Sequence, residues 1–164
     1  MAQTLVKKVR RNPVLTFGVT GGGFGLLFVL AAPIRGWLAG RGFTLPTGSL
    51  WLLVVGGFLG GSLLAWLLWE LLGGERSSVR GTVTGALVGL LALPVPFYLI
   101  EIALVVTGEN LFEPLPEASP VVRLLSDLLL FLLTPLLLGA IGLIPTYGGT
   151  IILGALVGYL LARD

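Results

Sequence analysis

Glu101 is the one charged residue in an apolar stretch that covers residues 81–108. A carboxylate inside a membrane span is costly unless it is paired or hydrated, so it marks a candidate functional site. At the spacing of an α-helix, Pro94, Tyr98 and Glu101 share one face. Proline also interrupts the helical hydrogen bonds and bends the helix. The sequence therefore predicts a kinked span with one polar face.

The nearest predicted partners of this carboxylate are Arg123 and Asp127, four residues apart at the start of the following helix. Three interpretations stay open for Glu101. It can form a structural ion-pair lock between two helices, contribute to a substrate or ion site, or reach the interface without a partner. Arg35 or Arg41 could also take part in the ion-pair lock or in the substrate or ion site.

Most enzyme chemistry lacks its usual residues in this chain. Cysteine and histidine are absent, which removes thiolate and imidazole chemistry and the usual zinc, haem and copper ligands. Only Glu101 and Asp127 could form a pair of carboxylates. The glycine-rich residues 20–25 lack both the preceding strand and the Gly-Lys-Ser/Thr ending of a phosphate loop. We therefore predict a protein that is not an enzyme and uses no metal or cofactor.

The composition is that of an integral membrane protein. The chain has 164 residues, of which 55% are hydrophobic and 11% charged, whereas a soluble domain has about 45–50% and about 25%. The net charge of +2 is too small to indicate nucleic-acid binding.

About 20 apolar residues are needed to cross a bilayer as a helix. The predicted spans are 14–34, 50–70, 81–106, 121–144 and 147–162. The last two come from one uncharged run, 128–162, divided at the turn pattern in residues 145–149. We predict an all-α, polytopic membrane helical bundle, a single domain of five spans. Four spans are the alternative, with the last segment as a re-entrant hairpin.

The basic residues Lys7, Lys8, Arg10 and Arg11 directly precede the first span. By the positive-inside rule they predict a multi-pass protein of the cell membrane with a cytoplasmic N-terminus. The loop at residues 108–120 is then external, and five spans place Arg163 outside as well.

Glycines spaced four residues apart recur in four of the spans. Small residues let helices approach closely in lipid, where no hydrophobic force drives their association. These glycines build either the core of the chain or an interface with other subunits. Residues 81–89 also resemble residues 149–158, which suggests an internal repeat. The candidate packing glycines are Gly18, Gly22, Gly56, Gly57, Gly60, Gly61, Gly81, Gly85, Gly89, Gly154 and Gly158.

The lack of catalytic chemistry and the many small-residue faces favour an accessory, assembly or structural subunit of a membrane complex. The alternative is an oligomeric channel or transporter for an ion or small solute, with Glu101 in its kinked helix. In either case the predicted partners are the lipid bilayer and further copies or other membrane subunits, and not nucleic acid.

Overall fold

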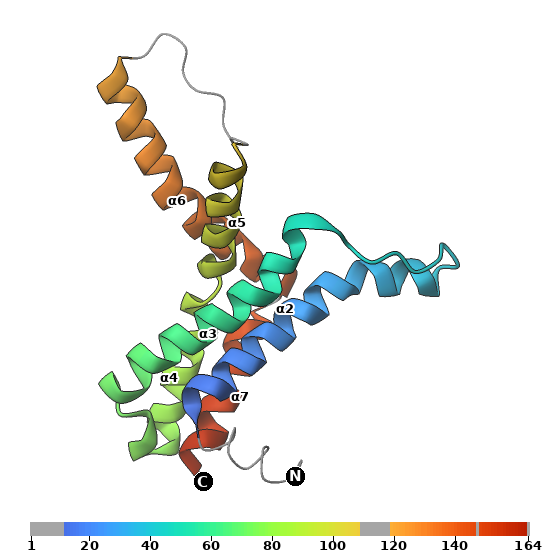
Figure 1. Ribbon diagram of the computed structural model, residues 1–164. Helices are drawn as coiled ribbons and strands as arrows, with labels where there is room; N and C mark the ends of the chain where they lie inside the picture. Colours follow the sequence, from blue (N-terminus) through green and yellow to red (C-terminus); the bar gives the residue numbers. More distant parts are fainter. Residues whose placement is uncertain (1–11, 109–118, 147, 164) are drawn as a thin grey trace.

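The computed structural model describes residues 12–108, 119–146 and 148–163. Over these ranges the chain is all-α (Figure 1). The basic cluster at residues 7–11 and most of the predicted external loop lie outside the described residues. The elements are α2 (Pro13–Leu38), η1 (Gly48–Trp51), α3 (Leu52–Leu71), η2 (Gly74–Arg76), α4 (Ser78–Leu91), α5 (Pro94–Thr107), α6 (Pro120–Thr146) and α7 (Gly149–Arg163).

Four stretches of the described chain are long and apolar enough to cross a membrane, which suggests a multi-pass membrane protein. This agrees with the predicted all-α membrane fold. The fifth predicted span corresponds to α7, which has 15 residues and is shorter than the other four. The four long stretches are Pro13–Leu38, Gly48–Leu71, Ser78–Thr107 and Pro120–Ile144.

Helices α2 and α3 form an antiparallel pair in which backbone touches backbone. Helix α2 begins at Pro13, where the backbone N–H of Leu15 donates to the side chain of Asn12 at 3.3 Å. Further along, a Cβ atom added at Gly21 would overlap the carbonyl oxygen of Gly57, and one added at Gly57 would overlap that of Gly21. Any larger side chain at these two positions would force the helices apart.

The doubled glycines of α3 serve two different neighbours. Gly57 and Gly61 face α2, whereas Gly56 and Gly60 face the start of α5, where Pro96 covers Gly56. Two stripes one residue apart point to different sides of a helix. Both stripes are therefore occupied within the chain.

The segments that resemble each other in sequence are the ones that pack together. Gly85 of α4 lies against Gly154 of α7, with Gly81 against Gly158 on one side and Gly89 against Thr150 on the other. The residue numbers rise on one helix and fall on the other, so α4 and α7 are antiparallel. Each of the eleven predicted packing glycines lies against another part of the chain, in some cases against its backbone and in others against a side chain.

The predicted kink is present, and it separates α4 from α5 at residues 92–93, here called the first interruption. Beyond it, α5 packs antiparallel to α6, with Pro94 against Gly139 and Tyr98 against Leu132. The predicted turn at residues 145–149 also ends a helix. We call the break between α6 and α7 the second interruption; there Gly148 has a φ of +69°.

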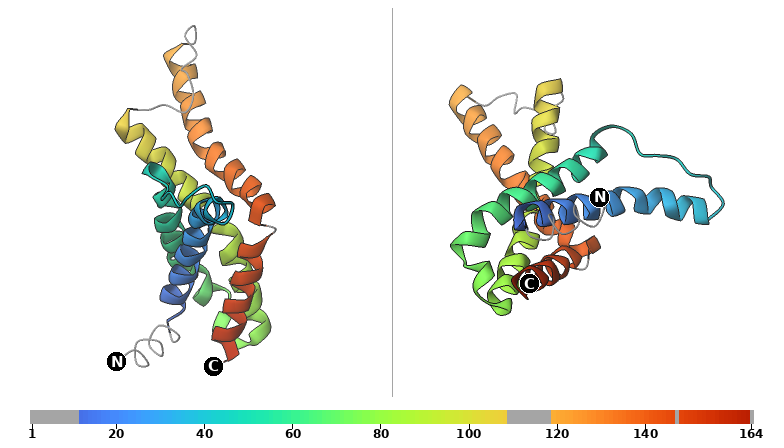
Figure 2. Two further views of the ribbon diagram at one scale, coloured as in Figure 1. Left: turned by 90° about the vertical axis from the view of Figure 1, so that its right-hand side faces the viewer. Right: turned by 60° about the horizontal axis from the view of Figure 1, so that its bottom comes forward.

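The chain does not reverse its course at this second interruption. Helix α6 packs antiparallel to α5, and α7 packs antiparallel to α4. Because α4 and α5 run in the same overall direction, α6 and α7 do so as well (Figure 2). The start of α2 and the end of α7 consequently lie at the same end of the molecule (Figure 1). The predicted five spans, with Arg163 opposite the N-terminus, stay a prediction, and the common direction of α6 and α7 is the observation that the alternative of four spans has in its favour.

The buried core lies among α2, α3, α4 and α7. It contains Phe17, Ala65, Trp69 and Val88, and the ring centroids of Phe17 and Trp69 are 5.9 Å apart. Helix α6 lies outside this core. The apolar side chains between residues 121 and 129 are at least half exposed, namely Val121, Val122, Leu124, Leu125, Leu128 and Leu129.

Candidate functional site

The predicted polar face of α5 is turned partly toward α6. A Cβ atom added at Gly139 would lie 2.8 Å from Pro94 Cγ, so a glycine is needed where α6 passes the proline. One turn further on, the Tyr98 hydroxyl donates a hydrogen bond of 2.9 Å to the Leu132 carbonyl oxygen. The Tyr98 ring also lies 5.9 Å from that of Phe131. Pro94 and Tyr98 therefore join the two helices.

Glu101 is buried, with 7% of its surface exposed. Its Oε2 atom has no hydrogen-bond partner among the described residues. A buried carboxylate without a partner is unfavourable in its charged form. It remains the most unusual polar group in the described part of α5.

Arg123 and Asp127 are exposed on the first half of α6. Within the described residues, no ion pair joins either of them to Glu101. The first part of α6 and the last part of α5 diverge from each other (Figures 1 and 2). The structure thus brings Pro94 and Tyr98 to α6 but leaves Glu101 apart from Arg123 and Asp127. A role of these three residues in a common site stays a prediction.

The sequence analysis missed a half-open pocket of about 120 Å³ that is lined by residues of α2, α3, α4, α5, α6 and α7, here called the central cavity. Both helix interruptions contribute to its wall. Ala92 and Leu93 line it at the first interruption, and Thr146 and Thr150 line it where α6 ends and α7 begins. Two interrupted helices facing one space is an arrangement found around the binding sites of membrane transporters.

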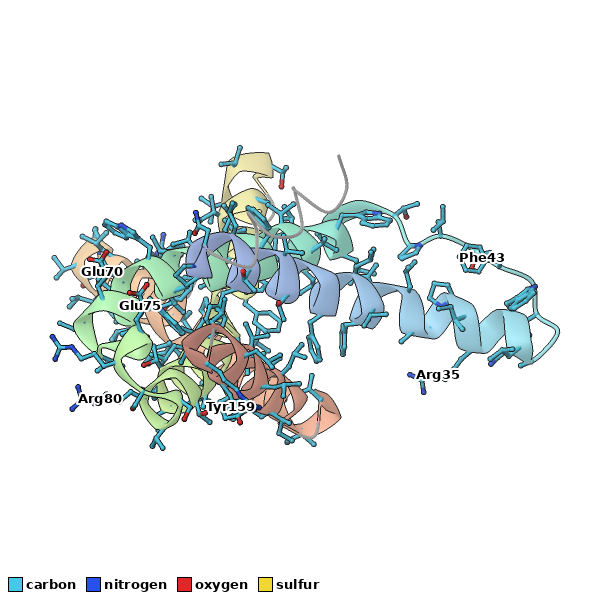
Figure 3. All side chains as sticks on the ribbon, turned by 90° about the horizontal axis from the view of Figure 1, so that it is seen from below. Arg35, Phe43, Glu70, Glu75, Arg80 and Tyr159 are labelled. Carbon is cyan, nitrogen blue, oxygen red and sulfur yellow. The ribbon has the colours of Figure 1, made fainter. Side chains whose placement is uncertain are left out.

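The wall of the central cavity is apolar and uncharged. Phenylalanine side chains come from two helices, Phe17, Phe24 and Phe28 from α2 and Phe97 from α5. No charged residue of the described chain lines the cavity. The charged side chains labelled in Figure 3 are exposed and lie at the periphery of the helices, namely Arg35, Glu70, Glu75 and Arg80.

Three threonines supply the polar groups of this wall. The hydroxyl of Thr20 donates to the Thr16 carbonyl oxygen at 2.8 Å, and that of Thr146 donates to Gly142 at 2.9 Å. The Oγ1 atom of Thr150 is buried and has no partner among the described residues. A sequence signal for the cavity existed in the proline pair and the turn at residues 145–149, because both interrupt apolar segments. Only the structure shows that the two interruptions line the same cavity.

No family model, no curated protein and no solved structure matches the chain.

Proposed function

We propose that the protein carries a small solute across the membrane by way of the central cavity. The observation that supports this proposal is that both helix interruptions line the same cavity. In this proposal α4 with α5, and α6 with α7, each make one crossing, so that the chain crosses four times. The proposal favours the transport alternative of the sequence analysis over the accessory subunit.

The interruptions supply places where the helices can bend. At the first one, the Leu93 N–H reaches the Leu90 carbonyl oxygen at 3.4 Å, and proline at position 94 has no N–H to donate. At the second, Gly148 adopts a left-handed conformation that other residues rarely adopt. Bending at both places would move α5 and α6 against the glycine-packed helices, and this is how the cavity could open to either side.

The contacts of the glycines weaken the main support for an accessory subunit. That interpretation depended on small-residue faces in excess of what one bundle needs, whereas the glycine stripes of α3, α4 and α7 contact neighbours within the chain. The exposed apolar side chains of α6 keep the accessory subunit as a second candidate, because another subunit could cover them in place of lipid.

The absence of cysteine makes a direct test possible. Leu153 lines the central cavity, and Leu156 on the same helix is 52% exposed on its surface. We would reconstitute Leu153→Cys and Leu156→Cys in vesicles and add a membrane-impermeant maleimide from each side in turn. Transport requires that Leu153→Cys react, while the lipid-facing control stays unlabelled.

A structural subunit has no need to open its interior to water. If Leu153→Cys reacts no faster than Leu156→Cys from either side, the transport proposal is wrong. Determination of the intact mass after gentle extraction would then decide whether other proteins accompany the chain at fixed stoichiometry.

A further inference from the structure

We propose that the basic segment at residues 7–11 binds back onto its own chain, in a polar pocket beside the start of α2. The groups that attract it are the carboxylates of Glu70 and Glu75, which line this pocket. The inference goes beyond the proposed transport and is independent of it, because it concerns opposite charges at one end of the molecule and not the central cavity.

The pocket, here called the terminal pocket, is a half-open space of about 430 Å³. The start of α2, the second half of α3 and the short helix η2 form its wall. Unlike the central cavity, it is lined by charged side chains. Its wall combines aromatic and charged groups, namely Trp66, Trp69, Glu70, Glu75 and Arg76.

The two carboxylates of the terminal pocket are exposed and form no ion pair with a described residue. Arg76 lines the same pocket, and its side chain lies over Gly73, where an added Cβ atom would be 2.9 Å from Arg76 Cδ. Figure 3 shows Arg80 apart from both carboxylates. Two carboxylates against one guanidinium leave the wall with one net negative charge.

The basic segment is joined directly to this pocket. Asn12, whose side chain caps α2, lines the pocket, and Arg11 is the residue before it. Five extended residues span at most about 18 Å, so no residue of the segment 7–11 can lie far from Asn12. An exposed ion pair is weak by itself, but a short tether keeps the local concentration of the cations at about the millimolar level. The cations of the segment are Lys7, Lys8, Arg10 and Arg11.

Trp66 offers the segment a second kind of contact. Its side chain is 66% exposed, and it lies four residues before Glu70, so both side chains share one face of α3. A guanidinium group can stack on an indole ring and donate to a carboxylate at the same time, whereas an ammonium group is a compact point charge. We therefore expect Arg10 and Arg11 to contribute more to binding than the two lysines.

The test measures the distance between the segment and the start of α4. The chain contains no cysteine, so Val9→Cys and Val79→Cys can carry the only two spin labels for double electron–electron resonance. Val79 is 71% exposed and does not line the terminal pocket. The full-length chain is placed in nanodiscs of phosphatidylcholine alone, or of an equal mixture of phosphatidylcholine and phosphatidylglycerol, because anionic headgroups also attract basic segments.

We expect a narrow distance distribution in phosphatidylcholine that high salt broadens. Glu70→Gln with Glu75→Gln should give a broad distribution shifted to longer distances. Asp127→Asn is the matched control, since it removes an exposed carboxylate outside the pocket, and it should leave the distribution narrow. Arg10→Glu with Arg11→Glu should also broaden the distribution, and the addition of Glu70→Arg and Glu75→Arg should make it narrow again.

Three results would overturn the inference. The first is a distribution in phosphatidylcholine that the glutamine variant leaves unchanged. The second is a narrow distribution that forms only with phosphatidylglycerol, because lipid headgroups and not the carboxylates would then bind the segment. The third is a charge exchange that fails to restore the narrow distribution. None of these results depends on the labelling of Leu153→Cys, so the transport proposal is tested separately.

Discussion

Helices α4 and α7 touch backbone to backbone, whereas α5 and α6, which follow and precede them in the chain, touch through side chains and then diverge (Figure 2). Gly81, Gly85 and Gly89 line the first contact, against Gly154 and Gly158 of α7. The second contact depends on one glycine, Gly139, together with a proline and a tyrosine. The α4–α5 segment and the α6–α7 segment therefore pack tightly where α4 meets α7 and loosely where α5 meets α6.

The difference follows from side-chain size. Without side chains between them, two helices gain van der Waals contact along their whole length, which is the main source of association in lipid. The apolar side chains at residues 121–129 of α6 are instead at least half exposed. We expect the α4–α7 half to act as a rigid base and the α5–α6 half to carry the motion.

The largest effect is expected from Gly85→Leu. A side chain at this position meets the Gly154 carbonyl oxygen, and backbone cannot move aside without separating α4 from α7. We expect loss of folded, monodisperse protein in size-exclusion chromatography, and for Gly85→Ala a loss of about 1–3 kcal/mol in the free energy of unfolding.

Gly23 is the matched control, because a Cβ atom there meets nothing within 4 Å. Gly23→Ala should be neutral or stabilise the helix by up to about 1 kcal/mol. If Gly85→Ala and Gly23→Ala changed the free energy of unfolding equally, the α4–α7 half would not be a rigid base.

The second experiment concerns the direction of α6 and α7. The start of α4 lies beside the end of α7, since a Cβ atom added at Gly81 would lie against Ala162. We therefore expect single cysteines at Arg80 and Arg163 to react with an impermeant reagent from the same side of the membrane. A cysteine at Thr44, between α2 and α3, should react from the other side. Labelling of Arg163→Cys together with Thr44→Cys would restore the five-span topology.

Glu101→Gln measures whether the looser half contains an ion-pair lock. Removing one partner of a buried pair costs about 3–5 kcal/mol. Because no described residue pairs with Glu101, we expect a change of less than about 1 kcal/mol in the free energy of unfolding. Exchange of Glu101 with Arg123 should then restore nothing. A large loss that the exchange rescues would establish the lock and contradict the separation of these residues.

The smallest effect is expected from Tyr98→Phe, which removes the hydrogen bond to the Leu132 carbonyl oxygen and keeps the ring beside Phe131. Interhelical hydrogen bonds in membranes contribute about 0.6 kcal/mol on average. Steric trapping in bicelles can resolve a change of this size. A loss well above about 2 kcal/mol would mean that the α5–α6 contact is more rigid than its geometry suggests.

The all-α class, the apolar segments and the break at Pro94 could be predicted from the amino-acid sequence, because helix propensity, hydropathy and proline act over a few neighbouring residues. It also identified the glycine stripes. Residues 56–57 and 60–61 show its limit, since the spacing marks two small faces on α3 but does not name the helix that each one meets.

The sequence could not predict which stripes meet, that α7 continues the direction of α6, or that the two interruptions line one cavity. These properties depend on contacts between residues far apart in the chain, such as Gly85 with Gly154 and Pro94 with Gly139. The separation of Glu101 from Arg123 has the same origin. Two residues on neighbouring helices can form a pair only where the helices pack against each other. The leucines at the start of α6 are exposed and do not pack this part of the helix against α5.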